Sequence, residues 1–355
     1  MMNNELINKV NESIERLEKN ENVIYFLTYD SKDKPMASIK HIYDIAYILH
    51  QNNHNVRILV EDKTYTGVSN WLGEKYNVLE VVPIKENTKQ INPEDILVVP
   101  EIYSNALEQL SKLKCVKVML VQQKEYIFET LPIGSKWINF GFDNVITTTQ
   151  SAQNYIQQYF PESSIYIIPP IVDDIFTPST APLKPFISIL TRERIKSRKI
   201  ISEFYLKYPQ LRWITFKDMV NLSYEDFASN LKECMVSVWI DDESTFGTFP
   251  LESMKCKIPV VGKIPNTEPD WLAENGIWTY DENKIVDLLA KYVLSYLEGV
   301  ELDDDVFTKM NESTLKYRTN VTESNVVSTF KAFTAVRLSK FRKLLENENK
   351  EEEQK

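Results

Sequence analysis

The chain of 355 residues is poor in glycine, histidine and cysteine, and it has no long apolar run. No stretch approaches the roughly 20 apolar residues that span a bilayer. The first 22 residues are too polar and charged for a signal peptide, so we expect a cytoplasmic protein without a transmembrane segment. The three cysteines are odd in number and form no Cys-x-x-Cys pair, which favours reduced thiols and argues against a zinc site.

The 3 histidines all lie within residues 41–54, which argues against a Ser-His-Asp triad built from distant parts of the chain. His50 and His54 have a spacing that occurs in metal sites, but no third ligand is near them in the sequence. We therefore expect no metal ion and no cofactor. The net charge of -10 excludes a surface that is basic all over, and it leaves open a local basic patch for nucleic acid.

Apolar runs of strand length alternate with helical patterns along the chain, which predicts an α/β protein with parallel sheets. The run at residues 23–28, the helical pattern at 39–49 and the run at 56–60 form the first βαβ unit. Further strands are expected at residues 96–100, 117–121, 144–149, 164–170, 186–190, 213–216, 235–240 and 259–262. Further helices are expected at residues 4–20, 105–112, 151–159, 199–208, 224–233 and 250–255.

A proline-rich stretch at residues 176–185 marks the boundary between the two halves. We expect a first Rossmann-like domain at residues 1–178, a second at 179–312, helices at 313–345 that pack back on the first domain, and a disordered tail at 346–355. The last helix carries an apolar stripe of Phe330, Phe333, Leu338, Phe341 and Leu345. Two doubly wound domains that face each other place a ligand in the cleft at the carboxyl ends of their strands.

One segment carries a family signature. Residues 236–264 read VSVWIDDESTFGTFPLESMKCKIPVVGKI. The strand, the Phe-Gly pair, the following glutamate and the Pro-Val-Val run resemble the donor site of retaining GT-B glycosyltransferases, specifically the glycogen-synthase-like family 4 (glycosyl transferases group 1), and Phe246 belongs to that donor-binding set. Residues 144–178, with IPPIVD in place of Pro-Asn-Gly-Ile/Val-Asp, and the Lys-His helix at residues 38–56 resemble the same family. The resemblance covers roughly residues 23–345.

The signature implies roles for individual residues. Gly247 lets the backbone approach a ligand, and the helix that opens near Thr248 points its amides at a diphosphate. Glu252 resembles the family glutamate that binds the ribose hydroxyls of the nucleotide. The family glutamate that contacts the donor sugar corresponds to Ser244 here. Glu243 lies one residue earlier, so either side chain is a candidate for the sugar contact.

Residues 187–204 resemble the family strand that ends in arginine and is followed by lysine. In the family these two cations neutralise the donor diphosphate and stabilise the leaving group. Arg192 matches the arginine. The lysine matches Lys196 or Lys199, and Lys196 is favoured.

Three more segments qualify the resemblance. The family often has a Gly-Gly loop near the donor phosphates, and here the small residues Ala37 and Ser38 stand in its place. The acidic run at residues 241–243 resembles a metal-binding Asp-x-Asp, but the Phe-Gly signature that follows favours a metal-independent site. The acidic run at residues 303–305 is expected to cap a helix.

The resemblance implies an enzyme of the EC 2.4 class, a glycosyltransferase that moves a sugar from a nucleotide-diphosphate sugar to an acceptor hydroxyl with retention of configuration. Arg192, Lys196 and Glu252 then form the catalytic set, and the nucleotide base is expected near residues 216–221. The leaving phosphate accepts the proton, so no protein base is required. The sequence identifies neither the acceptor, which could be a glycan, a lipid, a protein or a DNA base, nor the oligomeric state.

Two alternatives stay open. The basic residues of 337–343, together with Lys196, Arg198 and Lys199, suggest a phage-type enzyme that glycosylates DNA bases. Ser244 and the absent Gly-Gly loop suggest a GT-B binding protein that has lost catalysis.

Overall fold

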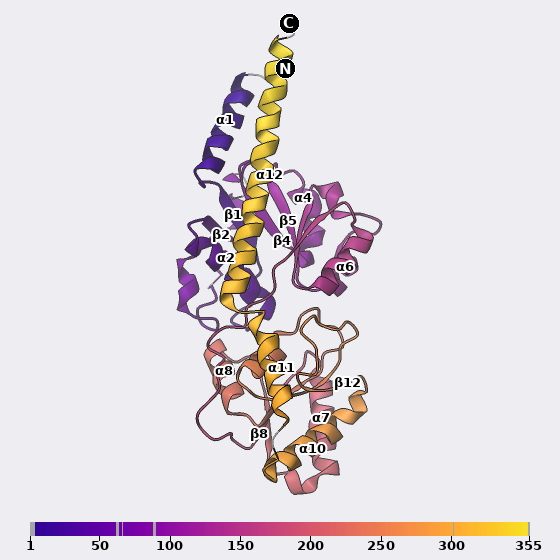
Figure 1. Cartoon of the computed structure of the whole chain (residues 1–355). Coiled ribbons are helices and arrows are strands. Elements are labelled where there is room, and N and C mark those ends of the chain that lie inside the picture. Colours follow the sequence, from indigo (N-terminus) through magenta and orange to yellow (C-terminus); the bar gives the residue numbers. More distant parts are fainter. Residues whose placement is uncertain (1–3, 62–63, 66, 88–89, 301, 354–355) are drawn as a thin grey trace.

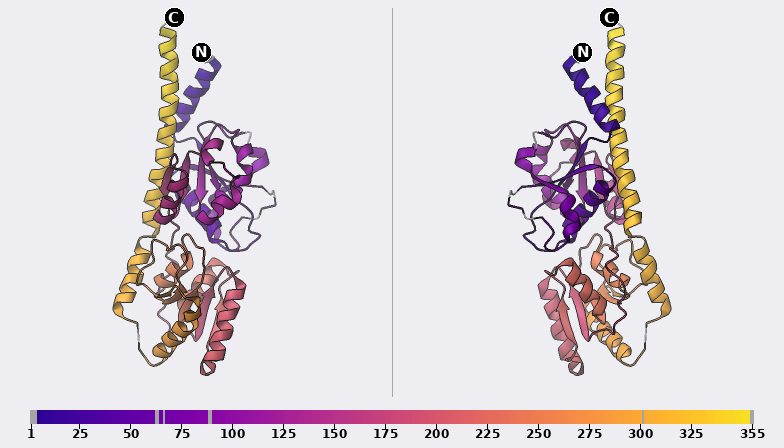
Figure 2. Two further views of the ribbon diagram at one scale, coloured as in Figure 1. Left: turned by 90° about the vertical axis from the view of Figure 1, so that its right-hand side faces the viewer. Right: turned by 90° about the vertical axis from the view of Figure 1, so that its left-hand side faces the viewer.

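The computed structural model describes residues 4–61, 64–65, 67–87, 90–300 and 302–353. Two sheets of parallel strands lie one above the other, as predicted, and the long last helix runs along the first sheet and projects beyond it (Figures 1 and 2). The first sheet has seven strands in the order β3-β2-β1-β4-β5-β6-β7. Its strands are β1 (Val23–Leu27), β2 (Asn55–Val60), β3 (Glu80–Pro83), β4 (Ile96–Pro100), β5 (Val116–Val121), β6 (Asn144–Thr147) and β7 (Ser164–Ile167).

The second sheet has five strands in the order β12-β11-β10-β8-β9. Its strands are β8 (Phe186–Leu190), β9 (Thr215–Asp218), β10 (Val236–Trp239), β11 (Val260–Lys263) and β12 (Ile277–Thr279). Every strand pair in both sheets is parallel among the described residues. The central strands are buried along their whole length, as expected for a sheet covered by helices on both faces.

Helices connect and cover the strands. The longer ones are α1 (Asn4–Glu18), α2 (Ala37–Gln51), α6 (Gln150–Tyr159), α7 (Arg194–Lys207), α8 (Tyr224–Glu233), α9 (Thr248–Lys255), α10 (Ile285–Leu297), α11 (Asp304–Leu315) and α12 (Thr319–Glu353). The short ones are α3 (Ile84–Asn87), α4 (Leu107–Leu110), α5 (Ile127–Thr130) and the 3-10 turns η1 (Glu74–Val78), η3 (Glu101–Ala106), η4 (Lys124–Tyr126), η5 (Trp137–Phe140), η6 (Pro209–Leu211) and η7 (Glu282–Lys284). Within the described ranges, no helix is both long and apolar enough to cross a membrane.

Strand order sets the position of a ligand site. In the second sheet the chain runs from β8 outward to β9 and then returns to place β10 on the other side of β8. The first sheet reverses in the same way between β1 and β4. Ligands of doubly wound folds bind beyond the carboxyl ends of the strands at such a reversal. The segments that follow β8 and β10, residues 191–193 and 240–247, therefore lie where a ligand is expected.

The last helix, α12, packs along the first domain. Val326, Phe330 and Phe333 are buried in the core of the first sheet, where the ring of Phe330 lies 5.9 Å from that of Phe26. Farther along, Phe341 packs with apolar residues of α1, and both helices project beyond the sheet (Figure 2). The prediction that the C-terminal helix crosses back to the first domain is confirmed.

Several sequence expectations differ from the structure at their boundaries. The last helix continues to Glu353, where we expected a disordered tail from residue 346, because Glu and Lys are good helix formers even without a core to cover; residues 354 and 355 lie outside the described residues. The expected strand at 213–216 is shifted to β9, and the expected helix at 105–112 divides into η3 and α4. The acidic run at 303–305 caps α11 as predicted, since the Asp303 carboxylate accepts a hydrogen bond from the Asp305 amide.

Candidate functional site

A cavity of about 230 Å³ lies between the two halves of the molecule. Its walls come from the start of α2, the turn after β9, and helices α8 and α9. The lining residues that matter below are Ala37, Lys40, His41, Asp44, Trp71, Met219, Val220, Asn221, Tyr224, Thr248 and Glu252. Three residues of the sequence-predicted site, Ala37, Thr248 and Glu252, are thus brought together from parts of the chain more than 200 residues apart in numbering.

Glu252 is the most unusual group in this wall. Its side chain is 5% exposed, and no hydrogen bond or ion pair to its carboxyl group occurs among the described residues. Burial raises the pKa of Glu252 to about 8; the positive charge of Lys40 opposes this shift, and the carboxylates of Asp173 and Asp44 reinforce it. A buried carboxyl without a partner is costly in a folded protein. It therefore indicates a group that is completed by a ligand.

A buried ion cluster borders the same cavity. The Lys40 Nζ lies 2.6 Å from the Asp44 carboxylate and 2.7 Å from the Asp173 carboxylate, and all three side chains are at most 14% exposed. Tyr76 donates a hydrogen bond to Asp44, and Tyr224 donates one of 2.7 Å to Asp173. Burial alone would lower the pKa of Lys40, but Asp44 and Asp173 outweigh it and raise that pKa above its ordinary value. We call Lys40, Asp44 and Asp173 the buried cluster.

Sequence reasoning did not assign a role to the buried cluster or to two of its neighbours. His41 is buried, and its burial together with the charge of Lys40 lowers the His41 pKa to about 3, so its ring is neutral. The buried indole N–H of Trp71 has no hydrogen-bond partner among the described residues. Lys40 and Asp44 are four residues apart on a helix, which is a recognisable ion-pair spacing. Asp173 comes from the inter-sheet segment, and only the tertiary structure brings it to Lys40.

The cavity wall is therefore close to neutral. Lys40, together with Lys75 at 3.8 Å from Asp173, balances the carboxylates of Asp44 and Asp173. His41 is uncharged, and Glu252 is largely protonated near pH 7. Met219, Val220 and Asn221, from the segment where we expected the nucleotide base, add an apolar and amide surface. Phe216, from the same expected segment, instead packs its ring against Phe204 and Tyr205 in the core. Such a wall suits an uncharged ring system better than a phosphate.

Two helix N-termini meet at this cavity. α2 begins at Ala37 and α9 at Thr248, and both residues are in the wall. Among the described residues, no side chain caps either helix at its N-cap residue, Met36 or Gly247. The first amides of each helix and its dipole are therefore available to an anion. Ser38 of the predicted site lies in the first turn of α2, where its hydroxyl is 3.2 Å from the Tyr29 hydroxyl.

The Phe-Gly signature is held firmly by its surroundings. Gly247 has a φ of 72°, and a Cβ atom there would lie 2.7 Å from the ring of Trp239, so glycine is required by conformation and by space. This close approach is to Trp239; the predicted approach of the Gly247 backbone to a ligand stays a prediction. Phe246 is buried against Tyr317, and its carbonyl accepts a hydrogen bond from Trp271. Ser244 is also buried, at 2% exposed, and Glu243 is exposed.

The cations of the predicted site lie at the strand ends and not in the cavity wall. The Arg192 backbone amide donates to the Asp241 carboxylate at 3.0 Å, and its guanidinium lies 3.4 Å from the Gln123 side-chain oxygen. Lys196 forms ion pairs with Asp242 and with Glu193. Lys199, the other candidate lysine, is 3.6 Å from Glu282.

Comparison with solved structures extends these observations. The pneumococcal O-GlcNAc transferase GtfA, in complex with UDP and GlcNAc, superposes with a TM-score of 0.65 and 10% identity over 88% of this chain and 99% of that one. Sucrose-phosphate synthase from Thermosynechococcus elongatus superposes with a TM-score of 0.61 and 11% identity over 89% of this chain and 100% of that one. Anabaena HepE in complex with UDP superposes with a TM-score of 0.60 and 10% identity over 88% of this chain and 100% of that one. The chain has the GT-B fold. No protein-family model and no curated protein sequence matches it.

In this GT-B chain the signature loop contacts the first domain directly. The Thr245 hydroxyl accepts a hydrogen bond from the Lys124 amide at 3.1 Å and donates one to the Glu125 carboxylate at 3.1 Å. The Gln123 side-chain amide donates to the Glu243 carbonyl, and its oxygen is 3.4 Å from the Thr245 amide. The loop that carries Glu243 and Ser244 is therefore fixed between the domains.

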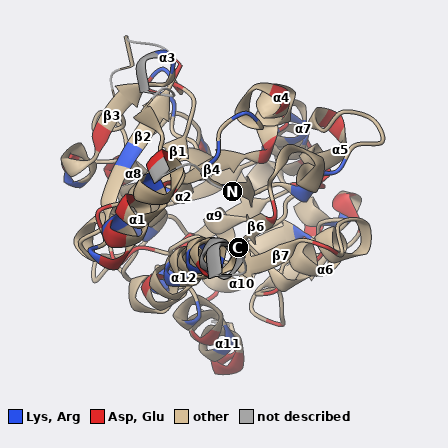
Figure 3. Ribbon diagram, turned by 90° about the horizontal axis from the view of Figure 1, so that it is seen from above, with Lys and Arg blue, Asp and Glu red and all other residues tan. Residues whose placement is uncertain are grey.

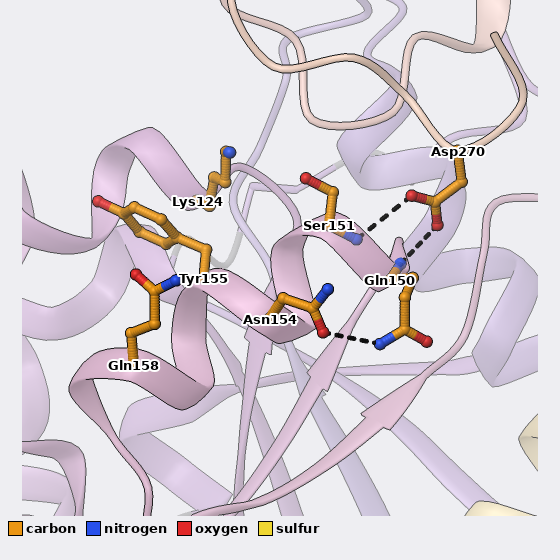
Figure 4. A pocket seen from close by; sticks show the side chains of 7 residues that line it. All are labelled: Lys124, Gln150, Ser151, Asn154, Tyr155, Gln158 and Asp270. Carbon is orange, nitrogen blue, oxygen red and sulfur yellow. Dashed lines mark hydrogen bonds between the residues drawn. The ribbon is translucent and has the colours of Figure 1, made fainter.

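A second contact between the domains lies at the start of α6. The Asp270 carboxylate, from the second domain, accepts hydrogen bonds from the backbone amides of Gln150 and Ser151 (Figure 4). It thereby occupies the N-terminus of a helix in the first domain. A polar hollow of about 440 Å³ lies beside this contact, lined by Lys124, Asn154, Tyr155 and Gln158 as well.

Proposed function

We propose that the chain is a glycosyltransferase that moves a sugar from a nucleotide-diphosphate sugar to an acceptor hydroxyl. The observation that carries the proposal is Glu252: a buried carboxyl group that has no partner within the described part of the chain and lies in the wall of a cavity between two domains of a GT-B fold. Ribose hydroxyls would complete its hydrogen bonding. Relatives in fold were solved with UDP bound, which supports a nucleotide as the ligand.

In the proposed complex, the nucleoside lies in the nearly neutral cavity, with the base against residues 219–221 and the ribose on Glu252. The diphosphate lies between the N-termini of α2 and α9, where Ala37, Ser38 and Thr248 offer amides and Arg192 offers a cation. These groups stabilise charge that develops on the leaving phosphate. We propose that the sugar lies toward the loop of Glu243 and Ser244.

The chemistry proposed is transfer with retention of configuration, in which the leaving phosphate accepts the proton of the acceptor hydroxyl. This fits the cavity wall, because the lowered pKa of His41 makes its ring a poor proton acceptor, and the Nδ1 atom of that ring lies 3.2 Å from the Gln122 side-chain amide. The acceptor enters from the first domain. The three free cysteines are buried, which is compatible with the reducing compartment that we propose.

Specific contacts weaken the DNA-directed alternative. Arg337 donates hydrogen bonds to the carbonyls of Pro93 and Lys114, and Arg342 pairs with Glu18. Lys340 lies 3.9 Å from the Asp143 carboxylate, so three of the four basic residues of this helix face are already bound to the protein itself. Lys and Arg are also interspersed with Asp and Glu when the molecule is seen along α12 (Figure 3). Salt-dependent binding of duplex DNA at low ionic strength would restore that alternative.

The test is a thermal-shift screen against UDP-, GDP-, ADP- and TDP-sugars, followed by titration of the best ligand. A ligand at about 100 times its dissociation constant adds roughly 2.7 kcal/mol of stability. We expect Glu252→Ala to weaken nucleotide binding by roughly 10- to 100-fold, since the buried hydrogen bonds between this carboxyl group and the ribose hydroxyls are lost. Glu298→Ala, on the exposed end of α10, is the matched control.

Unchanged affinity in Glu252→Ala would remove the assignment of Glu252 to the nucleotide. Transfer or hydrolysis of the donor above background separates an active enzyme from a binding protein that has lost catalysis.

A further inference from the structure

A second cluster of charges lies at the carboxyl ends of three neighbouring strands of the second sheet. Lys196 follows β8 on α7, Asp242 follows β10, and Lys263 ends β11. The Asp242 carboxylate pairs with Lys196 through one oxygen and with Lys263 through the other. We call these three residues the strand-end cluster.

The strand-end cluster is partly open to solvent. Lys196 and Lys263 are 14% and 17% exposed, and Asp242 is 31% exposed. Burial alone would raise the pKa of Asp242, but the hydrogen bonds from Lys196 and Lys263 hold that pKa below its ordinary value. Asp242 is therefore an anion that occupies both lysines at neutral pH.

The surroundings leave no net positive charge at this position. Glu193 lies 2.9 Å from Lys196, and Glu282 lies within 4 Å of both Lys196 and Lys199. Three lysines thus face three carboxylates, and their formal charges cancel. An incoming diphosphate would be attracted to the lysines only if one carboxylate moved away.

We propose that Asp242 is an internal competitor of the donor diphosphate. It holds Lys196 and Lys263 in the free protein, and a diphosphate displaces it and takes over both lysines. This inference rests on the proposed function for the identity of the ligand, and it makes Asp242 a residue that sets how tightly the diphosphate binds. Asp242 is the carboxylate suited to this role because each of its two oxygens accepts a hydrogen bond from a different lysine, whereas Glu282 lies 3.6 Å from Lys199 and 3.9 Å from Lys196.

The experiment measures the binding of inorganic pyrophosphate to the full chain by calorimetry. We expect Asp242→Asn to bind pyrophosphate about five-fold more tightly than the unmodified chain, because two partly exposed ion pairs no longer compete. The control is Asp287→Asn, which removes the same charge and frees Lys207 from a similar pair of 3.2 Å at the far end of α7. It should leave the affinity unchanged.

The tighter binding of pyrophosphate should disappear in the double variant Asp242→Asn/Lys196→Met, because Lys196, which Asp242→Asn frees, is then absent. An Asp242→Asn affinity equal to or weaker than that of the unmodified chain overturns the proposal.

A crystal structure of the unmodified chain with pyrophosphate gives a second test that does not depend on the folding of a variant. Lys196 in contact with the phosphate, and parted from Asp242, supports the proposal, whereas Lys196 still paired with Asp242 contradicts it. Pyrophosphate has neither ribose nor base. If Glu252 proves not to bind the nucleotide, the pyrophosphate result is unaffected. A failure of the proposal for Asp242 can therefore be distinguished from a failure of the proposed function.

Discussion

The buried cluster and the strand-end cluster have the same chemistry and differ in exposure. Lys40 is 8% exposed and bridges carboxylates that are 4% and 14% exposed, whereas Asp242 is 31% exposed and bridges two lysines. In the buried cluster, water cannot replace a lost partner, so each charge depends on the others. In the strand-end cluster, water and ligand ions can compete. The comparison teaches that burial decides whether an ion cluster stabilises the fold or can exchange its partners for water and ligand ions.

The largest effect is expected from breaking the buried cluster. Lys40→Met leaves Asp44 and Asp173 as neighbouring buried carboxylates, and we expect it to lower the free energy of unfolding by about 3–5 kcal/mol. Denaturant unfolding followed by circular dichroism measures this loss. A loss below about 1 kcal/mol would show that the two clusters do not differ in the way proposed here.

The next effect concerns Glu252, whose pKa responds to the buried cluster. Its folded-state pKa of about 8 is above the ordinary value for a glutamate, so the folded state binds the proton more tightly than the unfolded state. The stability that comes from this proton is fully present below about pH 4.3 and is lost as the pH rises through about 8.

We therefore expect the unmodified chain to lose on the order of 3 kcal/mol relative to Glu252→Gln between about pH 5 and pH 9. Unfolding free energies of both proteins at the two pH values provide the measurement. Parallel pH profiles would mean that Glu252 is not protonated in the folded state.

The smallest effect is expected from the strand-end cluster. Lys263→Met leaves Asp242 paired with Lys196 and accessible to water, so we expect a loss of stability below about 1 kcal/mol. The same unfolding experiment as for Lys40→Met gives a direct comparison of the two clusters. A loss as large as that of Lys40→Met would make the strand-end cluster a structural element and would argue against displacement by a ligand.

Much of the fold could be predicted from the sequence because its signals are local. Buried parallel strands appear as continuous apolar runs, and the apolar stripe of α12 correctly indicated a helix that packs on the first domain. The strands β3 and β12 were missed because they are short and only partly buried, so their apolar pattern is weak. Helix α10 was also not assigned from the sequence, and of α11 only the acidic start was predicted.

The candidate site, like the fold, could be predicted from the sequence only where its residues are neighbours along the chain. The sequence determined that Gly247 precedes a helix which carries Glu252, because glycine, helix start and glutamate are neighbours along the chain. Only the tertiary structure decided that Lys40, Asp173 and Glu252 share one buried environment, and that Lys196 is held by Asp242. These contacts join segments tens to hundreds of residues apart. A charge is compensated or left without a partner by whatever the fold brings next to it, and this cannot be read from spacing along the chain.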